Sequence, residues 1–297
     1  MTTATAPAVS LAVAKPEGLW GKARKRFFRH KLAMFGLITL SVLIFVSVAA
    51  PLLTPHSPIE IDLRAIRQPP SAEHWLGTDG TGRDVLTRLL YAGRISLSVG
   101  LVAVSISMVI GIIVGSIAGY AGGKVDMTLM RVTDVFMTFP SLVIIITVAA
   151  AIGPSVFNAM LVIGLLTWPS IARLVRGQFL TLREQQFVRA ARSIGVSRGQ
   201  ITFKHIFPNT ISSIAVAVTI GVANVILLEA SLSFLGLGVQ APIPSWGNML
   251  RDAQSLNILE GMPWIWLPPG LMIALAVLSI NFIGDGLRDT LDPRSIL

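Results

Sequence analysis

Six apolar segments, each long enough to cross a lipid bilayer, constrain this chain more than any other feature. A helix rises about 1.5 Å per residue, so about 20 apolar residues cross a hydrocarbon core of about 30 Å. Apolar residues make up 53% of the chain and charged residues only 13%, about half the share in a soluble domain. We therefore expect an all-α polytopic membrane protein with six transmembrane helices, at residues 32–53, 95–118, 135–152, 155–174, 211–237 and 265–283.

Basic residues predict the orientation of these helices. With both termini in the cytoplasm, 18 of the 24 Lys and Arg residues lie in cytoplasmic segments, as the positive-inside rule requires. This placement accounts for the net charge of +9, so we expect a lipid bilayer and not nucleic acid as the partner of the basic residues. The first apolar segment is too long for the core of a signal peptide and is expected to remain as an anchor.

The predicted spans divide the chain into five regions. They are a cytoplasmic tail ending in a basic interfacial helix (1–31), a first transmembrane helix (32–53), an extracytoplasmic loop (54–94), a core of five helices (95–288) and a cytoplasmic C-terminal tail (289–297). Within the first region, residues 1–18 are expected to be disordered.

A charged stretch inside the core, residues 181–209, carries two helix-start signals and is called the elbow below. Thr181 with Glu184, and Ser197 with Gln200, fit the capping-box pattern. Gly195 lies where a left-handed residue ends a helix, and Pro208 is expected to end the next helix. The pattern predicts two short cytoplasmic helices, about 182–194 and 198–206, the first with an apolar face of Phe187, Ala190, Ala191 and Ile194.

Two glycine-rich runs resemble phosphate-binding loops but lack the residues that such loops need. The run 77–84 has no Gly-Lys-Ser/Thr ending, and we interpret it as a structured turn. The run 118–125 has Ala118 in place of the first glycine and Val125 in place of the last Ser/Thr. We interpret it as a tight cytoplasmic turn, so the chain is expected to have no ATPase site of its own.

Polar and small residues inside the spans indicate where helices meet. Gly111, Gly115 and Gly119 form one stripe that permits close packing of helices. Glu229 lies at membrane depth, where an ionisable side chain faces protein or water. It is either a hydrogen-bonded structural acid or, with Asn224 and Asn281, a residue of a translocation path.

Two other classes of protein are considered from the residues. Pro140 lies near the start of the third span, and Pro268 to Gly270 are expected to break the sixth. Broken helices are typical of secondary transporters, but the internal repeats of that class are not evident. The sequence Gly195-x-Ser197-x-Gly199 matches the nucleophile elbow of hydrolases. That motif requires a preceding strand, so we interpret Ser197 as a helix cap.

The elbow resembles the EAA signature of the permease subunits of ABC importers, through Arg189-Ala190-Ala191, Gly195 and Pro208. Arg189 replaces the family's Glu, and the family's Ile is shifted to Ile206. Further stretches resemble the dipeptide/oligopeptide/nickel branch of the family and its "C" member: 74–79, 82–86, Gly122-Gly123 with Asp126, Met130-Arg131 with Asp134, 231–236, 244–247 and 284–289. The resemblance covers about residues 20–295.

This resemblance implies a type I ABC importer permease fold and an ATP-driven peptide importer of the bacterial cytoplasmic membrane that works by alternating access. The implied partners are a sister permease, two cytoplasmic ATPases that bind the ATP and Mg²⁺, an extracytoplasmic substrate-binding protein and a peptide; nickel chelates, glutathione or other solutes are alternative cargoes. No cofactor is expected in this chain. The implied ATPase-coupling residues are Phe187, Arg189, Ala190, Ala191, Arg192, Ile194 and Gly195.

Overall fold

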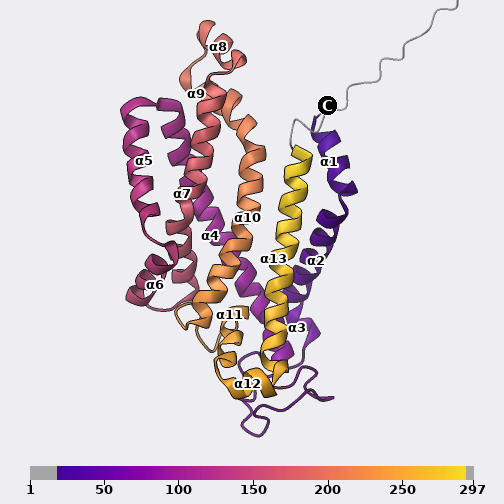
Figure 1. Cartoon of the computed structure of the whole chain (residues 1–297). Helices are drawn as coiled ribbons and strands as arrows, with labels where there is room; N and C mark the ends of the chain where they lie inside the picture. Colours follow the sequence, from indigo (N-terminus) through magenta and orange to yellow (C-terminus); the bar gives the residue numbers. More distant parts are fainter. Residues whose placement is uncertain (1–18, 292–297) are drawn as a thin grey trace, which may run out of the picture.

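The protein forms one elongated bundle of long helices, seen in a computed structural model that describes residues 19–291 (Figure 1). Five helices in this part of the chain are long and apolar enough to cross a membrane, and a bent helix pair makes a sixth candidate. The all-α prediction is therefore confirmed. The expected disordered tail, residues 1–18, and residues 292–297 of the C-terminal tail lie outside the described residues.

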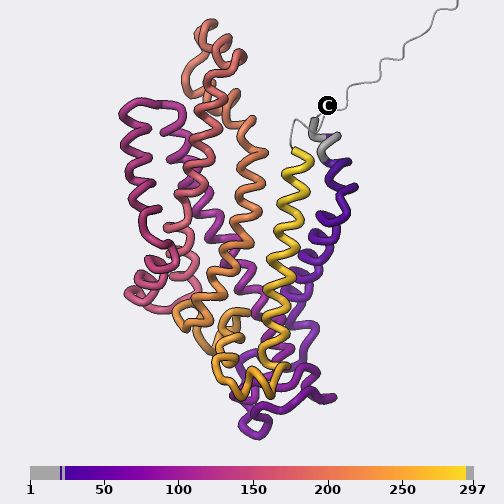
Figure 2. The backbone as a smooth tube through the Cα atoms, viewed as in Figure 1, coloured from indigo at the N-terminus to yellow at the C-terminus, as the bar shows by residue number. Residues whose placement is uncertain are grey.

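The N-terminal part consists of α1 (Leu19–Arg29), α2 (Lys31–Val48) and the short α3 (Ala50–Leu53). His30 separates the first two helices and caps α2, because its Nδ1 accepts a 3.1 Å hydrogen bond from the N–H of Ala33. The helix α2 packs against α13 (Pro263–Leu291), which Figure 2 shows as the yellow tube beside the indigo one. A Cβ on Gly286 would come within 2.4 Å of the Ala33 Cβ, so this contact depends on a small residue.

The helix α4 (Val85–Ala121) is one continuous helix that begins well before the predicted span. The irregular part of the predicted loop 54–94 therefore ends at Asp84, whose side chain caps α4 by accepting from Thr87 N at 2.6 Å. The helix packs most extensively against α7 (Val156–Arg183). The glycine stripe lies in this contact, where Cβ atoms on Gly111, Gly115 and Gly119 would approach α7 atoms to 2.7, 2.5 and 2.5 Å.

The third predicted span, 135–152, is wrong as a single helix. The chain turns at Gly122 and forms α5 (Gly123–Thr138) and α6 (Ser141–Ile152), which are bent by 81° at the break between them. Phe139 is extended, with φ −95° and ψ 145°. The physical reason is Pro140, because the residue before a proline is forced away from the helical region.

Three prolines expected to interrupt helices do not end them. Pro208 lies in the first turn of α10 (Phe207–Phe234), which follows α9 (Arg198–Gln200) and a π-helical segment, η1 (Ile201–Ile206). The helix is π-helical just before this proline, where Phe207 N bonds to Thr202 O five residues back, and the Asn209 side chain donates to His205 O at 2.6 Å. Pro268 and Pro269 lie inside the continuous α13, and Pro269 is buried.

The connection from α10 to α13 folds back into the bundle. It contains α11 (Trp246–Met249), the 3-10 helix η2 (Leu250–Gln254) and α12 (Leu256–Gly261). Trp246 is buried, and its indole N–H donates to Leu89 O on α4 at 3.1 Å. This connection and the loop 54–84 lie at one end of the bundle, whereas α1, the end of α13 and the elbow lie at the other (Figure 1).

Candidate functional site

The elbow projects from the end of the bundle as a short helix bent back on a left-handed glycine (Figure 1). The helix α8 (Gln186–Ser193) ends in a Schellman motif. The N–H of Val196 bonds to Ala191 O and the N–H of Gly195 bonds to Arg192 O, both at 3.1 Å. Gly195 has φ +80°, as predicted from its position, so the bend depends on a residue that adopts this conformation without strain.

The second helix start of the elbow is confirmed and the first is wrong. The Ser197 hydroxyl caps α9 by accepting from Gln200 N at 3.4 Å. Thr181 instead lies inside α7 and donates to Gly177 O at 3.1 Å, because α7 continues to Arg183. The helix α8 begins after a turn at Gln185, which makes no side-chain cap.

The apolar residues of α8 divide between two faces. Val188 and Ala191 are buried against the ends of α7 and η1, in a cluster that includes Phe179, Ile201 and Ile206. Phe187, Ala190 and Ile194 lie on the outer side, where Phe187 is 42% and Ile194 81% exposed. Of the four residues predicted on one apolar face, Ala191 alone therefore packs inside the elbow.

The remaining predicted coupling residues are exposed. Arg189 Nη2 lies 3.2 Å from Glu184 Oε2, in a pair whose side chains are 67% and 61% exposed. Such an exposed ion pair contributes little stability, about 0–1 kcal/mol. Arg192 and Gly195 are also exposed. The exposed surface of α8 thus combines an apolar strip of Phe187, Ala190 and Ile194 with the arginine side chains of Arg189 and Arg192.

Two contacts that sequence reasoning missed hold the base of the elbow. Arg176 on α7 binds both carboxylate oxygens of Asp126 on α5, at 2.5 and 2.7 Å. Arg183, at the end of α7, donates to Gly119 O at 3.0 Å. A bidentate Arg–carboxylate pair fixes orientation as well as distance, so α7 enters the elbow at a defined angle to the turn at Gly122.

The buried carboxylate of Glu229 joins three segments in the opposite half of the bundle. It has no exposed surface, and its two oxygens accept from Ser96 Oγ at 3.0 Å and Ser233 Oγ at 2.7 Å. Each serine in turn accepts a backbone N–H of the returning connection, from Trp246 at 3.1 Å and Val239 at 3.0 Å. This arrangement favours the interpretation of Glu229 as a hydrogen-bonded structural acid.

The other two polar residues of the spans lie in different surroundings. Asn224 is exposed on α10, and Asn281 on α13 is half-buried. Asn224 continues an exposed stripe at helical spacing along α10, which consists of Ile220, Asn224, Leu227 and Ser231.

At the same end as the returning connection, the predicted turn 77–84 is confirmed as a structured loop. Gly77 and Gly82 have φ +68° and +80°. Asp79 is the centre of the loop: it accepts from the N–H of Thr81 at 2.8 Å and pairs with Arg83 at 2.7 Å and Arg88 at 3.3 Å.

Two carboxyl groups near this loop have pKa values shifted in opposite directions. Burial alone would raise the pKa of Asp79, but the N–H of Thr81 and the charges of Arg83 and Arg88 outweigh it and hold the pKa below its usual value. Burial, together with the charge of Asp79, raises the pKa of Asp252.

A bundle of membrane-spanning helices with a bent, exposed elbow at one end defines the class of multi-pass membrane proteins. Comparison with known families gives the particular family. Residues 111–296 match the family described as binding-protein-dependent transport system inner membrane component, and residues 18–70 match the N-terminal TM domain of oligopeptide transport permease C. The chain belongs to this family of ABC transporter permeases and is a multi-pass inner membrane protein.

Curated relatives are similar over nearly the whole chain. A putative peptide permease protein of Brucella suis is 46% identical over 280 residues, which cover 94% of this chain and 93% of the relative. The dipeptide transport system permease protein DppC of Alkalihalophilus pseudofirmus is 45% identical over 275 residues, covering 93% and 90%. The oligopeptide transport system permease protein OppC of Haemophilus influenzae is 42% identical over 278 residues, covering 93% and 89%.

Proposed function

We propose that this chain is a permease subunit of an ATP-driven importer that passes peptides across the cytoplasmic membrane by alternating access. The observation that carries the proposal is the uncovered apolar strip of Phe187, Ala190 and Ile194 on the elbow. Apolar side chains exposed beyond the membrane-spanning helices are a docking surface for another protein. Peptide cargo is proposed from the relatives named as dipeptide and oligopeptide permeases.

The energy for import comes from two ATPase subunits that grip the elbow. Both glycine-rich runs of this chain lack the Gly-Lys-Ser/Thr ending that holds nucleotide phosphates and Mg²⁺. ATP and Mg²⁺ therefore bind in the partners, and this chain has no ATPase site. Closure of the ATPases moves α8 and with it the end of α7. The Arg176–Asp126 and Arg183–Gly119 contacts transmit that movement from α7 to α5 and α4.

Two polar residues in the exposed stripe on α10 support a translocation path between this chain and a sister permease. Asn224 and Ser231 are polar residues on an exposed side of a membrane-spanning helix. Polar side chains at membrane depth face protein or a water-filled cavity in preference to lipid. We therefore assign Asn224 to the path, with Asn281 as a second residue of it, and Glu229 to the scaffold behind it.

The elbow lies on the cytoplasmic side and the loop 54–84 on the outside. The distribution of Lys and Arg supports this orientation, since 18 of 24 fall in the segments assigned to the cytoplasm. An extracytoplasmic binding protein then delivers the peptide to the end of the bundle that holds α11 and α12.

Cysteine labelling tests the docking surface directly, because the chain has no native cysteine. Ile194→Cys should react rapidly with a maleimide when the two permeases are purified alone and at least about tenfold more slowly with the ATPases bound. Leu63→Cys, which replaces a 74% exposed residue at the other end of the bundle, is the matched control and should react equally in both preparations. Equal labelling of Ile194→Cys with and without the ATPases would refute the assignment.

Uptake into proteoliposomes tests the importer. With binding protein and labelled peptide outside and ATP inside, uptake should stop with a non-hydrolysable ATP analogue and continue with a proton ionophore. Uptake that survives without ATP hydrolysis but stops with the ionophore would identify a secondary transporter. If the binding protein carries a nickel chelate or glutathione, the assignment of peptides as the cargo is wrong, but the protein is still a permease of an ATP-driven importer.

A further inference from the structure

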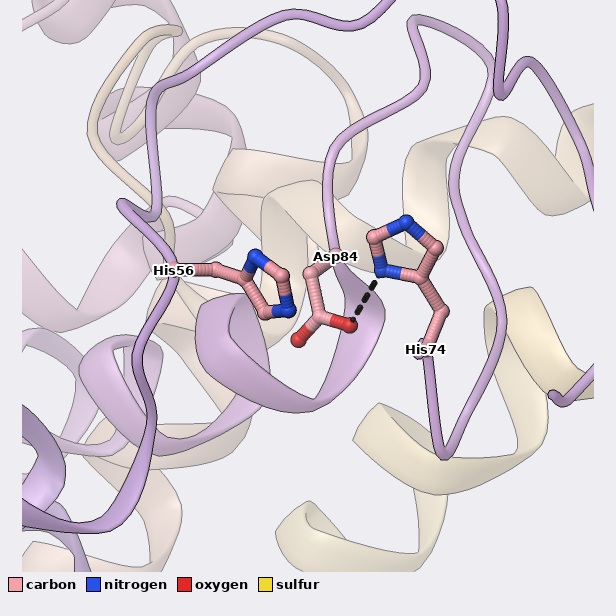
Figure 3. A group of neighbouring side chains, drawn as sticks. All are labelled: His56, His74 and Asp84. Atoms are coloured by element: carbon pink, nitrogen blue, oxygen red, sulfur yellow. Dashed lines mark hydrogen bonds and ion pairs between the residues drawn. The ribbon is translucent and has the colours of Figure 1, made fainter. Parts of the chain in front are cut away.

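Two histidines and one aspartate converge where the loop 54–84 meets the first turn of α4. His56 follows α3, His74 lies in the loop and Asp84 caps α4. One ligand atom from each side chain lies within 4.8 Å of the other two. Figure 3 shows both imidazole rings turned toward the carboxylate of Asp84, from opposite sides.

We infer that His56, His74 and Asp84 form a binding site for a divalent transition metal ion of the zinc type, separate from the proposed elbow and path. Two imidazole nitrogens and one carboxylate oxygen suit zinc, whereas Mg²⁺ and Ca²⁺ prefer oxygen ligands alone. Zn–N and Zn–O bonds of about 2.0–2.2 Å place tetrahedral ligand atoms about 3.3 Å apart. The three ligand atoms already lie within 4.8 Å of one another, so binding requires a shift of about 1.5 Å, which we assign to the His56 side chain.

The burial and bonding of the three residues suit such a site. His74 is 9% and Asp84 5% exposed, while His56 is half-buried. Asp84 Oδ1 is held by the N–H of Thr87 at 2.6 Å, so Oδ2 is oriented toward the histidines. A ligand fixed in this way by a backbone donor binds metal more strongly than a free one.

The contacts that the ion would replace are few. His74 Nδ1 lies 3.0 Å from Asp84 Oδ2, so the ion would replace this hydrogen bond, with His74 as a neutral ring that binds through Nδ1 and carries its proton on Nε2. His56 Nε2 makes a 3.3 Å contact with Glu73 O, longer than the usual 2.9–3.0 Å. A cavity of about 150 Å³, lined in part by His56, Glu73 and Asp84, offers space for a water as the fourth ligand.

The ion would join three segments that are otherwise held by separate contacts: the end of α3, the loop and the start of α4. Binding to the folded state alone raises stability with the concentration of free metal. The site would therefore make the conformation of the loop depend on zinc.

Metal binding to the assembled complex, purified through a tag without histidine, tests the inference. After dialysis against limiting Zn²⁺, wild-type complex should hold one more zinc ion than complex carrying His56→Gln, and Co²⁺ should give a visible absorption band that His56→Gln lacks. Zinc, but not Mg²⁺ or Ca²⁺, should raise the melting temperature of the wild type. The variant should bind zinc at least about tenfold more weakly.

Controls separate this site from other metal-binding groups. The chain has four histidines, and His205→Gln, in the elbow, should leave zinc binding unchanged. Asp84→Asn is a second variant that keeps a helix-capping side chain while removing the charge, and it should also lose the ion. Equal zinc content in wild type and in both site variants would overturn the inference and leave a hydrogen-bonded cluster only.

Discussion

The Ser96 hydroxyl on α4 donates a 3.0 Å hydrogen bond to the carboxylate of Glu229 on α10, and it also accepts the backbone N–H of Trp246. One serine therefore connects two membrane-spanning helices and the connection that returns between them. Ser233, on α10 itself, donates to the other carboxylate oxygen and accepts the N–H of Val239, so it links α10 to the same connection. The Glu229 carboxylate is therefore the acceptor shared by both serine hydroxyls.

Replacing Glu229 with alanine should destabilise the protein. Two buried serine hydroxyls lose their acceptor, and leaving a buried polar group unsatisfied costs about 1–3 kcal/mol. We expect the melting temperature of the detergent-purified complex to fall for Glu229→Ala and to fall less for Glu229→Gln, which keeps an acceptor oxygen. Asn224→Ala, on the exposed stripe of the same helix, is the control and should leave the melting temperature unchanged. An unaltered melting temperature for Glu229→Ala would show that the network contributes no stability.

Adding one methyl group at Gly115 should weaken the contact between α4 and α7. A Cβ there would come within 2.5 Å of Ala172 O and 2.8 Å of the Val175 Cβ. The first of these atoms belongs to the backbone, so the helices must separate, at a cost of about 1–3 kcal/mol. Gly115→Ala should lower thermal stability, whereas Gly177→Ala, whose Cβ meets no described atom within 4 Å, should not. Similar stability of the two variants would contradict the close-packing role of the stripe.

The glycine stripe and the helical spans could be predicted because each depends on local sequence. Segment length and hydropathy define a span, and a repeat of four places glycines on one face. The bend at Gly195 was predictable for the same reason, since the left-handed position follows directly from the end of a helix.

Proline effects were harder to predict, because the outcome depends on what surrounds the residue. Pro140 bends the chain by 81° between α5 and α6, but Pro208 and Pro269 lie inside continuous helices. A π-helical segment precedes the first of these two, and the second is buried among neighbouring helices. Both are tertiary features that a residue's neighbours in sequence do not reveal.

Long-range contacts of the site were also beyond sequence reasoning. The pairs Arg176–Asp126 and Ser96–Glu229 join residues on separate helices, and no spacing rule links them. On α8, periodicity placed Ala191 with Phe187 and Ile194, although Ala191 is buried and the other two are exposed. A helix with apolar residues on two sides has two interfaces, and periodicity alone cannot separate them.

The loop at Asp79 should lose stability in acid. Its pKa is held below the usual value, so the ionised form stabilises the fold above the unfolded-state pKa of about 3.9, and this contribution is lost as pH falls through the lower, folded-state pKa. Asp79→Asn should therefore reduce the melting temperature at pH 7, and the difference from wild type should shrink below about pH 4.

Asp252→Asn is the matched control, because the pKa of Asp252 is raised, whereas that of Asp79 is lowered. Its ionised form opposes the fold at neutral pH, so removing the charge should leave stability at pH 7 equal or higher. Thermal melts of both variants across pH 3–8 check this contrast. A pH-independent loss for Asp79→Asn would show that the residue acts through packing and not through its charge.

Substitutions at Gly195 should separate the bend of the elbow from its docking. Proline cannot adopt φ +80° because its ring fixes φ near −65°, so Gly195→Pro should uncouple ATP hydrolysis from transport. Asparagine tolerates the left-handed region, and a Cβ at this position meets no described atom within 4 Å. Gly195→Asn should therefore keep most of the activity.

Gly195→Trp adds bulk where this chain alone has space, so a loss of function beyond that of Gly195→Asn would come from a clash with a partner. We expect transport and transport-stimulated ATPase activity of the reconstituted complex to fall at least about tenfold, equivalent to about 1.4 kcal/mol of coupling. The melting temperature of the permease pair without ATPases should match that of Gly195→Asn. Normal transport and stimulated ATPase activity in both Gly195→Pro and Gly195→Trp would mean that the elbow is not gripped at this bend.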